Sequence, residues 1–289
     1  FFLPEAYLVG GICGVLFRHQ RMIMSRRSLN EYQTHYPRLT KIEKKLHSRM
    51  CYVLGNSQAV MQNLYYEGVS SESARLIYNG VDIAPQPDLL QRSLLRSKFG
   101  ISENDLVFIV VANLIAYKGH ADLIKALGTI AGKMIAPWRL LIVGRDDGIR
   151  ASLEETAKEM GISDNIIFTG EFVSARDLWS VGDIGVLPSH QEGFSNSILE
   201  GMSACLPMVV TNVGGNAEAV LHGETGLVVS PHCPEQLGEA LYTLASDPEK
   251  RRIYGVAARS RVERDFSVDN CIEEYKRVYE SVLSSGDTV

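Results

Sequence analysis

Short, unbroken apolar runs separated by helical patterns constrain the fold of this chain more than any other feature. Residues 106–111 read Leu-Val-Phe-Ile-Val-Val, and residues 140–143 read Leu-Leu-Ile-Val. A strand that is apolar on both sides is covered on both faces, which is typical of a parallel sheet enclosed by helices. From residue 88 onward strands and helices alternate strictly, so the sequence predicts a doubly wound α/β domain.

The elements of this domain are predicted from apolar periodicity. Strands are predicted at 106–112, 138–143, 165–169, 183–187, 207–211 and 226–229. Helices are predicted at 88–99, 118–133, 149–160, 174–180, 197–204, 215–221, 234–246, 248–264 and 267–283. Ligands of such sheets bind beyond the carboxyl ends of the strands, and polar or glycine residues fall there at Asn113, Gly144, Glu192 and Gly214.

The first 85 residues carry helical patterns and then a strand, a turn and a helix. Strands are predicted at 50–54 and 74–78, and Ser57 is expected to cap a helix at 58–66. Two prolines, Pro85 and Pro87, break the pattern and predict a linker. Four residues are expected on a solvated basic helix, with an acceptor-facing role as the alternative: Arg26, Arg27, Tyr32 and Tyr36.

The stretch 189–200 predicts a strand-to-helix junction with an acid on each side, Glu192 and Glu200. A helix start rich in small residues presents backbone N–H groups and suits a phosphate. We expect Asn196 or Ser197 to cap this helix. Eight helical residues span about 12 Å, so the two acids cannot hold one small atom. They suit hydroxyl-rich groups on either side of an anion, which describes a nucleotide sugar.

Lys118 and four glycines support an anion site. A positive charge is not favoured at the start of a helix, so Lys118 is expected to bind the diphosphate of a ligand. The alternative is a lysine that is simply exposed to solvent. Gly214 and Gly215 are expected to form a second backbone platform. Gly144 and Gly148 do not form a Gly-x-Gly-x-x-Gly fingerprint, which disfavours a nicotinamide enzyme.

Charge and metal-ligating residues exclude other classes of function. The net charge is −5, which disfavours nucleic acid as a partner. The five cysteines lie far apart, without a Cys-x-x-Cys pair, and are expected to be reduced and mostly buried. Four histidines (120, 190, 222 and 232) lie on separate loops, and their spacing predicts no metal site.

Together these residues resemble the donor-binding domain of retaining glycosyltransferases of the GT-B fold, specifically glycosyltransferase family 4. The matching motifs are Asn-Gly-Val-Asp at 79–82, Lys-Gly-His at 118–120, Glu-x7-Glu at 192–200 and Gly-Gly-Asn-x-Glu at 214–218. They stand in the family's order and spacing, so the resemblance spans residues 48–285. Asn113 stands where many members carry an arginine.

The resemblance implies three parts and assigns the site residues. Residues 1–85 would be the end of an incomplete, Rossmann-like N-terminal domain, 86–265 the donor-binding domain, and 266–289 a helix packing back toward the first. The start of the chain then lies inside a larger protein. Glu192 and Lys118 would be catalytic, with Glu192 on the sugar and Glu200 on the ribose. The donor-binding residues would be Asn113, Gly144, Gly193, Phe194, Ser195, Asn196, Glu200, Gly214 and Gly215.

The implied activity is retaining transfer of a hexosyl group from a nucleotide-diphosphate sugar to an acceptor hydroxyl. UDP is the expected nucleotide, and GDP or ADP fit the same residues. The acceptor would be a saccharide or a lipid-linked saccharide in cell-surface polysaccharide or glycolipid synthesis. The resemblance further implies no metal or other cofactor, and a cytoplasmic protein, peripheral at the inner membrane face. A non-catalytic regulatory protein that binds nucleotide sugars is the alternative, and Asn113 is its support.

Overall fold

The structure, a computed structural model, describes residues 1–289 except 3, 30–32, 34–35, 84–88, 173–174 and 285–289. The chain forms two compact units. The first comprises residues 1–80, 192–194 and 266–289, and the second comprises 81–191 and 195–265. The linker expected at Pro85 and Pro87 lies outside the described residues, as does Tyr32.

The second unit is built on a six-stranded parallel sheet with the strand order β6-β5-β4-β7-β8-β9. The strands are β4 (Leu106–Val111), β5 (Trp138–Val143), β6 (Ile166–Gly170), β7 (Ile184–Leu187), β8 (Met208–Thr211) and β9 (Gly226–Val229). Strand order reverses between β4 and β7, which lie side by side at the centre of the sheet. This is the doubly wound arrangement that the apolar runs predicted.

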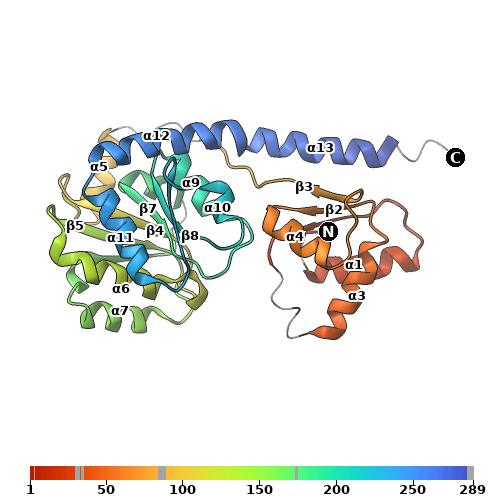
Figure 1. Cartoon of the computed structure of the whole chain (residues 1–289), viewed down its shortest axis with the longest axis horizontal. Coiled ribbons are helices and arrows are strands. Elements are labelled where there is room, and N and C mark those ends of the chain that lie inside the picture. Colours follow the sequence, from red (N-terminus) through yellow and green to blue (C-terminus); the bar gives the residue numbers. More distant parts are fainter. Residues whose placement is uncertain (3, 30–32, 34–35, 84–88, 173–174, 285–289) are drawn as a thin grey trace. The chain divides into compact units, whose positions relative to one another are not determined.

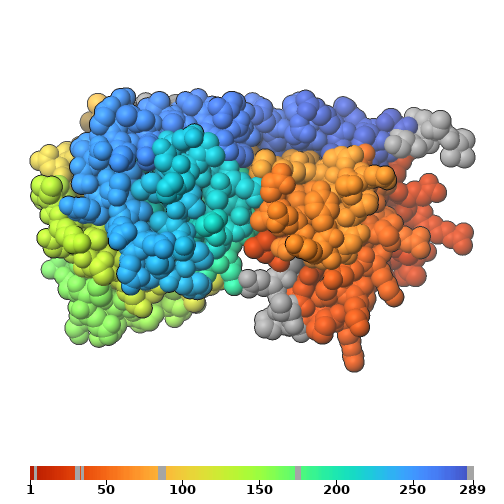
Figure 2. Space-filling model, viewed as in Figure 1, coloured from red at the N-terminus to blue at the C-terminus, as the bar shows by residue number. Residues whose placement is uncertain are grey.

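Helices cover the sheet of the second unit (Figure 1). They are α5 (Leu89–Lys98), α6 (His120–Ile130), α7 (Arg150–Glu159), α8 (Ala175–Leu178), α9 (Asn196–Ser203), α10 (Asn216–Ala219), α11 (Pro234–Ala245) and α12 (Pro248–Asp265). Helix α6 packs against α7 and α11, whereas α9 packs against α12. The two stretches of chain that make the unit form one continuous surface, coloured yellow to light blue in Figure 2.

Both faces of this sheet are buried. Phe108 and Val110 belong to the core cluster that also contains residues of α6, α7 and α11. Their neighbours Val107 and Ile109 point to the opposite face and are also fully buried. This two-sided burial explains why β4 has no polar residue.

The first unit contains a three-stranded parallel sheet with the order β1-β2-β3. Its elements are α1 (Pro4–Leu16), β1 (Ile23–Arg26), α3 (Pro37–His47), β2 (Tyr52–Gly55), α4 (Gln58–Tyr66), β3 (Ala74–Leu76) and α13 (Val268–Ser284). The predicted cap is confirmed, because the hydroxyl of Ser57 accepts a hydrogen bond from the Val60 N–H at 3.1 Å. None of the helices in the described ranges is long and apolar enough to cross a bilayer.

Helix α13 packs within the first unit. Val278 clusters with Leu54 and Ile77, and Tyr275 lies partly buried against them. The hydroxyls of Tyr275 and Ser25 are 3.1 Å apart. The C-terminal helix therefore completes the core on one side of the small sheet.

Arg26 corrects the expectation of a solvated basic helix. It ends β1, is 4% exposed, and its guanidinium binds Glu43 and Glu67 at 2.5 Å each. Glu67 also lies 2.9 Å from His47, whose other ring nitrogen lies 2.8 Å from the hydroxyl of Tyr7. The positive charge of Arg26 was evident from the sequence. Its partners Glu43 and Glu67 were not, because they lie 17 and 41 residues away along the chain.

The cysteines also differ in part from the expectation. No disulfide joins the five cysteines, all of which the structure describes; Cys13 is exposed and the other four are half-buried. The expectation of mostly buried thiols is therefore wrong.

Candidate functional site

The candidate site of the second unit lies at the carboxyl ends of β4 and β7 (Figure 1). In doubly wound sheets generally, the crossovers from two such neighbouring strands lie on opposite faces at the point where strand order reverses. The loop after β4 carries Lys118, and the loop after β7 leads into α9. Ligands of doubly wound sheets bind in this position.

Lys118 ends a single 3₁₀ turn, Ala116–Lys118, and Gly119 then precedes α6. Gly119 has φ +72°, and a Cβ there would lie 1.9 Å from the carbonyl oxygen of Pro188. Only glycine fits this close approach of two backbones. The His190 N–H also donates to the Tyr117 carbonyl at 2.7 Å. The loops after β4 and β7 are thus fixed to each other beside the lysine.

The ammonium of Lys118 is half-buried at the start of α6, and its Nζ lies 5.2 Å from the centre of the Tyr117 ring. Burial lowers the pKa of the neighbouring His120 to about 4, the Ala112 carbonyl raises it, and the charge of Lys118 lowers it further. His120 is therefore neutral at pH 7. Lys118 contributes the positive charge at this helix start.

The end of β5 is joined to the end of β4 by Asn113. Its Oδ1 accepts a hydrogen bond from the Arg145 N–H at 3.3 Å. The side chain of Arg145 forms an exposed ion pair with Asp147 at 2.8 Å. Gly144, between these strand ends, packs against the backbone of Ala112. The side-chain oxygen of Asn113 therefore already accepts a hydrogen bond. Its side-chain NH₂ group is the part that can donate to a ligand.

Helix α9 begins at Asn196, with Ser195 as the N-cap residue. Capping by Asn196 or Ser197 is not observed. Ser195 makes no side-chain capping hydrogen bond, and the hydroxyl of Ser197 instead donates to the Val111 carbonyl at 2.7 Å. This bond fixes the start of α9 to the end of β4. An N-terminus without a side-chain cap from its N-cap residue retains backbone donors for an anion.

Glu200 lies in the second turn of α9 and is half-buried. The indole N–H of Trp179 donates to its Oε2 at 3.3 Å, and Trp179 itself is fully buried. The tryptophan thus orients the carboxylate. No sequence pattern pointed to this pair, because its members are 21 residues apart in different elements.

The glycines Gly214 and Gly215 lie in the loop between β8 and α10. Gly214 is half-buried and Gly215 is buried. The following Asn216 is fully buried, and its Nδ2 donates to the Thr211 carbonyl at 3.1 Å, which ties the loop to the end of β8. The loop therefore lies at the same edge of the sheet as Lys118.

Residues 192–194 belong to the first unit. A Cβ on Gly193 would lie 2.3 Å from the Arg27 carbonyl oxygen, so glycine is required there. The Phe194 carbonyl accepts from Nδ2 of Asn79 at 3.1 Å, and the Oδ1 of Asn79 accepts from Arg27 at 2.7 Å. Within the first unit, Asn79 therefore joins Phe194 to Arg27. Arg27 follows β1 and lies on no helix, so the expectation of a solvated basic helix is wrong for this residue also.

The ring of Phe194 is 5% exposed and packs between Tyr78 and Phe266, at centroid distances of 5.1 and 5.5 Å. Glu192 is half-buried. The structure thus brings together Lys118, Asn113, Gly144, Ser195, Asn196, Glu200, Gly214 and Gly215 at one sheet edge of the second unit. It groups Glu192, Gly193 and Phe194 with the first unit.

Comparisons with known proteins identify the family and the fold. The sequence model of the family "Glycosyl transferases group 1" matches residues 91–261. The N-acetyl-alpha-D-glucosaminyl L-malate synthase of Bacillus anthracis is 27% identical over 215 residues, which is 74% of this chain and 55% of that protein. The chain thus spans about half the length of this relative.

Solved structures show the same fold. The crystal structure of HepE from Anabaena in complex with UDP superposes with a TM-score of 0.89 at 22% identity, covering 97% of this chain and 78% of that one. The complex of HepE with UDP-glucose gives 0.88 at 23% identity, with coverages of 97% and 78%. The α/β fold of the GT-B type that the sequence predicted is confirmed.

Proposed function

The chain belongs to the glycosyl transferases group 1 family, and from this premise we propose that it is a retaining hexosyltransferase of glycosyltransferase family 4. It moves a sugar from a nucleotide-diphosphate donor to an acceptor hydroxyl. One observation carries the proposal: a lysine and a helix N-terminus lie on adjoining loops at the point where strand order reverses. Both supply positive potential, and a diphosphate is the ligand that needs it.

The diphosphate binds between Lys118 and the first turn of α9. Two contacts support this placement, because the Ser197 hydroxyl holds α9 to the end of β4 and the His190 N–H holds the adjoining loop to Tyr117. Asn113 donates its NH₂ group in place of the usual arginine, and Gly144, Gly214 and Gly215 let the ligand approach the backbone. Charge develops on the diphosphate as the sugar leaves, so its stabilisation is the largest catalytic term.

The two acids contact the hydroxyl groups of the donor. Glu200, oriented by Trp179, accepts from the ribose, and Glu192 accepts from the sugar. Gly193, Phe194, Ser195 and Asn196 link the two acids and supply backbone contacts. UDP is the proposed nucleotide, which the complexes of HepE with UDP and UDP-glucose support. GDP and ADP are the alternatives, and measuring the affinity of the protein for each of the three nucleotides distinguishes them.

The acceptor is a saccharide or lipid-linked saccharide, as in the synthesis of cell-surface polysaccharide or glycolipid. The protein works in the cytoplasm, at the inner membrane face when the acceptor is lipid-linked. The chemistry needs no metal, because the ammonium and the helix N-terminus neutralise the leaving diphosphate.

The proposal is tested by transfer assays on the full-length protein with a panel of nucleotide sugars and acceptors. Lys118→Ala and Glu192→Ala should each lower kcat/KM by about 10²–10³, as expected for loss of a group that stabilises the transition state. Two matched controls should keep activity: Lys125→Ala, an exposed lysine on α6, the helix that follows Lys118, and Glu224→Ala, an exposed loop acid. Retention is read from the anomeric configuration of the product by NMR.

Unchanged rates in both site variants would remove the assignment of these residues. Binding of a nucleotide sugar without either transfer or donor hydrolysis would support the regulatory alternative instead. The position of Asn113 does not decide between these outcomes, because its amide donates a hydrogen bond in either case.

A further inference from the structure

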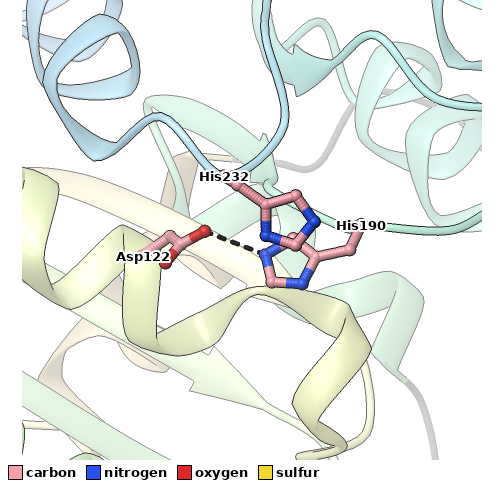
Figure 3. Close-up of side chains that lie close together, drawn as sticks. All are labelled: Asp122, His190 and His232. Carbon is pink, nitrogen blue, oxygen red and sulfur yellow. Dashed lines mark hydrogen bonds and ion pairs between the residues drawn. The ribbon is translucent and has the colours of Figure 1, made fainter.

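Three residues from separate parts of the second unit lie together: Asp122, His190 and His232 (Figure 3). Asp122 is in the first turn of α6, His190 follows β7, and His232 lies between β9 and α11. The carboxyl ends of parallel strands share one edge of the sheet, and this topology brings together side chains up to 110 residues apart. The spacing of the histidines along the sequence did not reveal it.

The side-chain atoms of these three residues are close enough together to bind one metal ion. Nε2 of His190 lies 2.8 Å from Oδ2 of Asp122, and the two imidazole rings lie 3.7 Å apart with planes inclined by 36°. One ligand atom from each residue lies within 4.8 Å of the others. The side chains of Asp122 and His190 are about 20% exposed and His232 is exposed, so an ion can reach them.

Imidazole nitrogen and carboxylate oxygen are ligands that Zn²⁺ prefers, at about 2.0–2.2 Å. In a tetrahedral site, ligand atoms at these bond lengths are about 3.3 Å apart. To bind one ion, Nε2 of His190 and Oδ2 of Asp122 need to move slightly apart from their 2.8 Å separation, and the ring of His232 needs to move toward them. His232 is exposed on a loop, so a rotation of its side chain supplies this movement.

A second cluster in the first unit shows what disfavours a metal. Glu43, His47 and Glu67 are equally close together, but the guanidinium of Arg26 already binds both carboxylates. Asp122, by contrast, makes no ion pair with an arginine or a lysine among the described residues.

We propose that Asp122, His190 and His232 form a Zn²⁺ site with three protein ligands and water in the fourth position. The ion joins the loops after β4, β7 and β9. This site lies beside the proposed diphosphate site, because Asp122 follows Lys118 by four residues and His190 precedes Glu192 by two. It does not depend on transfer activity, so its failure leaves the proposed function untouched.

Titration calorimetry with ZnCl₂ tests the site on untagged protein that has first been stripped with a chelator. The expected result is one Zn²⁺ per chain and a rise in Tm that a chelator reverses. His190→Ala, His232→Ala and Asp122→Asn should each weaken binding roughly tenfold or more. His19→Ala, an exposed histidine of the first unit, is the matched control and should bind as the wild type does.

Visible absorption of the Co²⁺-substituted protein identifies the ligands. A tetrahedral spectrum without a thiolate band, unchanged in Cys233→Ser, supports two imidazoles and a carboxylate. Equal Zn²⁺ binding by the wild type and the three ligand variants would overturn the proposal, as would loss of binding in Cys233→Ser alone. Circular dichroism confirms that each variant is folded.

Discussion

At the scale of single residues, buried charge in the first unit is balanced by direct contacts. Burial alone raises the pKa of Glu67, but hydrogen bonds from His47 and Arg26 and the charge of Arg26 lower it to about 2. Burial lowers the pKa of Arg26, but the hydrogen bonds and charges of Glu67 and Glu43 raise it above its ordinary value. Removing one partner of a buried ion pair is strongly destabilising, because the other charge is then left buried without a partner.

The lowered pKa of Glu67 predicts a loss of stability in acid. The contribution is fully present above the ordinary value of 4.5 and is lost as the pH falls from there toward 2. Its size is on the order of 2–3 kcal/mol. Scanning calorimetry between about pH 7 and pH 3 measures it, and Glu67→Gln should flatten that part of the profile. The exposed Glu72→Gln should leave it unchanged, and equal profiles for all three proteins would contradict the account.

Candidate site residues stand out in the sequence where a local motif carries them. Lys118 is a candidate because a cation at a helix start is unusual, and the stretch from Glu192 to Glu200 because it joins a strand to a helix; their roles stay predictions. The partners of these residues were not predictable. The contacts of Trp179 with Glu200 and of Asn79 with Phe194 join residues 21 and 115 positions apart, and only the fold brings them together.

At the scale of elements, most strands and helices were predictable and are confirmed. The six strands of the second unit end within one residue of their predicted bounds, because unbroken apolar runs mark strands buried on both faces. Strand β1 was missed. Its four residues include Ser25 and Arg26, whose burial depends on partners elsewhere in the chain.

The contact between the loops after β4 and β7 predicts a strict need for glycine at position 119. Gly119→Ala adds a Cβ that meets the Pro188 carbonyl oxygen, a backbone atom that cannot move aside, and it also strains a positive φ. The expected loss of stability is about 1–3 kcal/mol. Urea unfolding followed by tryptophan fluorescence measures it, since Trp138 and Trp179 both lie in the second unit.

Gly132→Ala is the control for this substitution, because a Cβ at Gly132 meets nothing within 4 Å. Its stability should stay within about 0.5 kcal/mol of the wild type. A Gly119→Ala protein as stable as this control would show that the loops are not fixed together as described.

At the scale of the whole molecule, the sequence predicted the fold through motifs in a fixed order. Four motifs at the family's spacing identified the GT-B fold, which the superposition on HepE confirms. The donor sugar and the acceptor were not predictable, since sugars that differ in one hydroxyl differ in a single contact.

The central claim is that Lys118 and the start of α9 hold the diphosphate of the donor. Comparing UDP with UMP by titration calorimetry, in the wild type and in Lys118→Ala, tests it most directly. We expect the wild type to bind UDP more tightly than UMP, and the variant to lose roughly ten- to hundredfold in affinity for UDP while its affinity for UMP changes little. Equal affinities for UDP and UMP in the wild type, or a preference that persists in the variant, would contradict it.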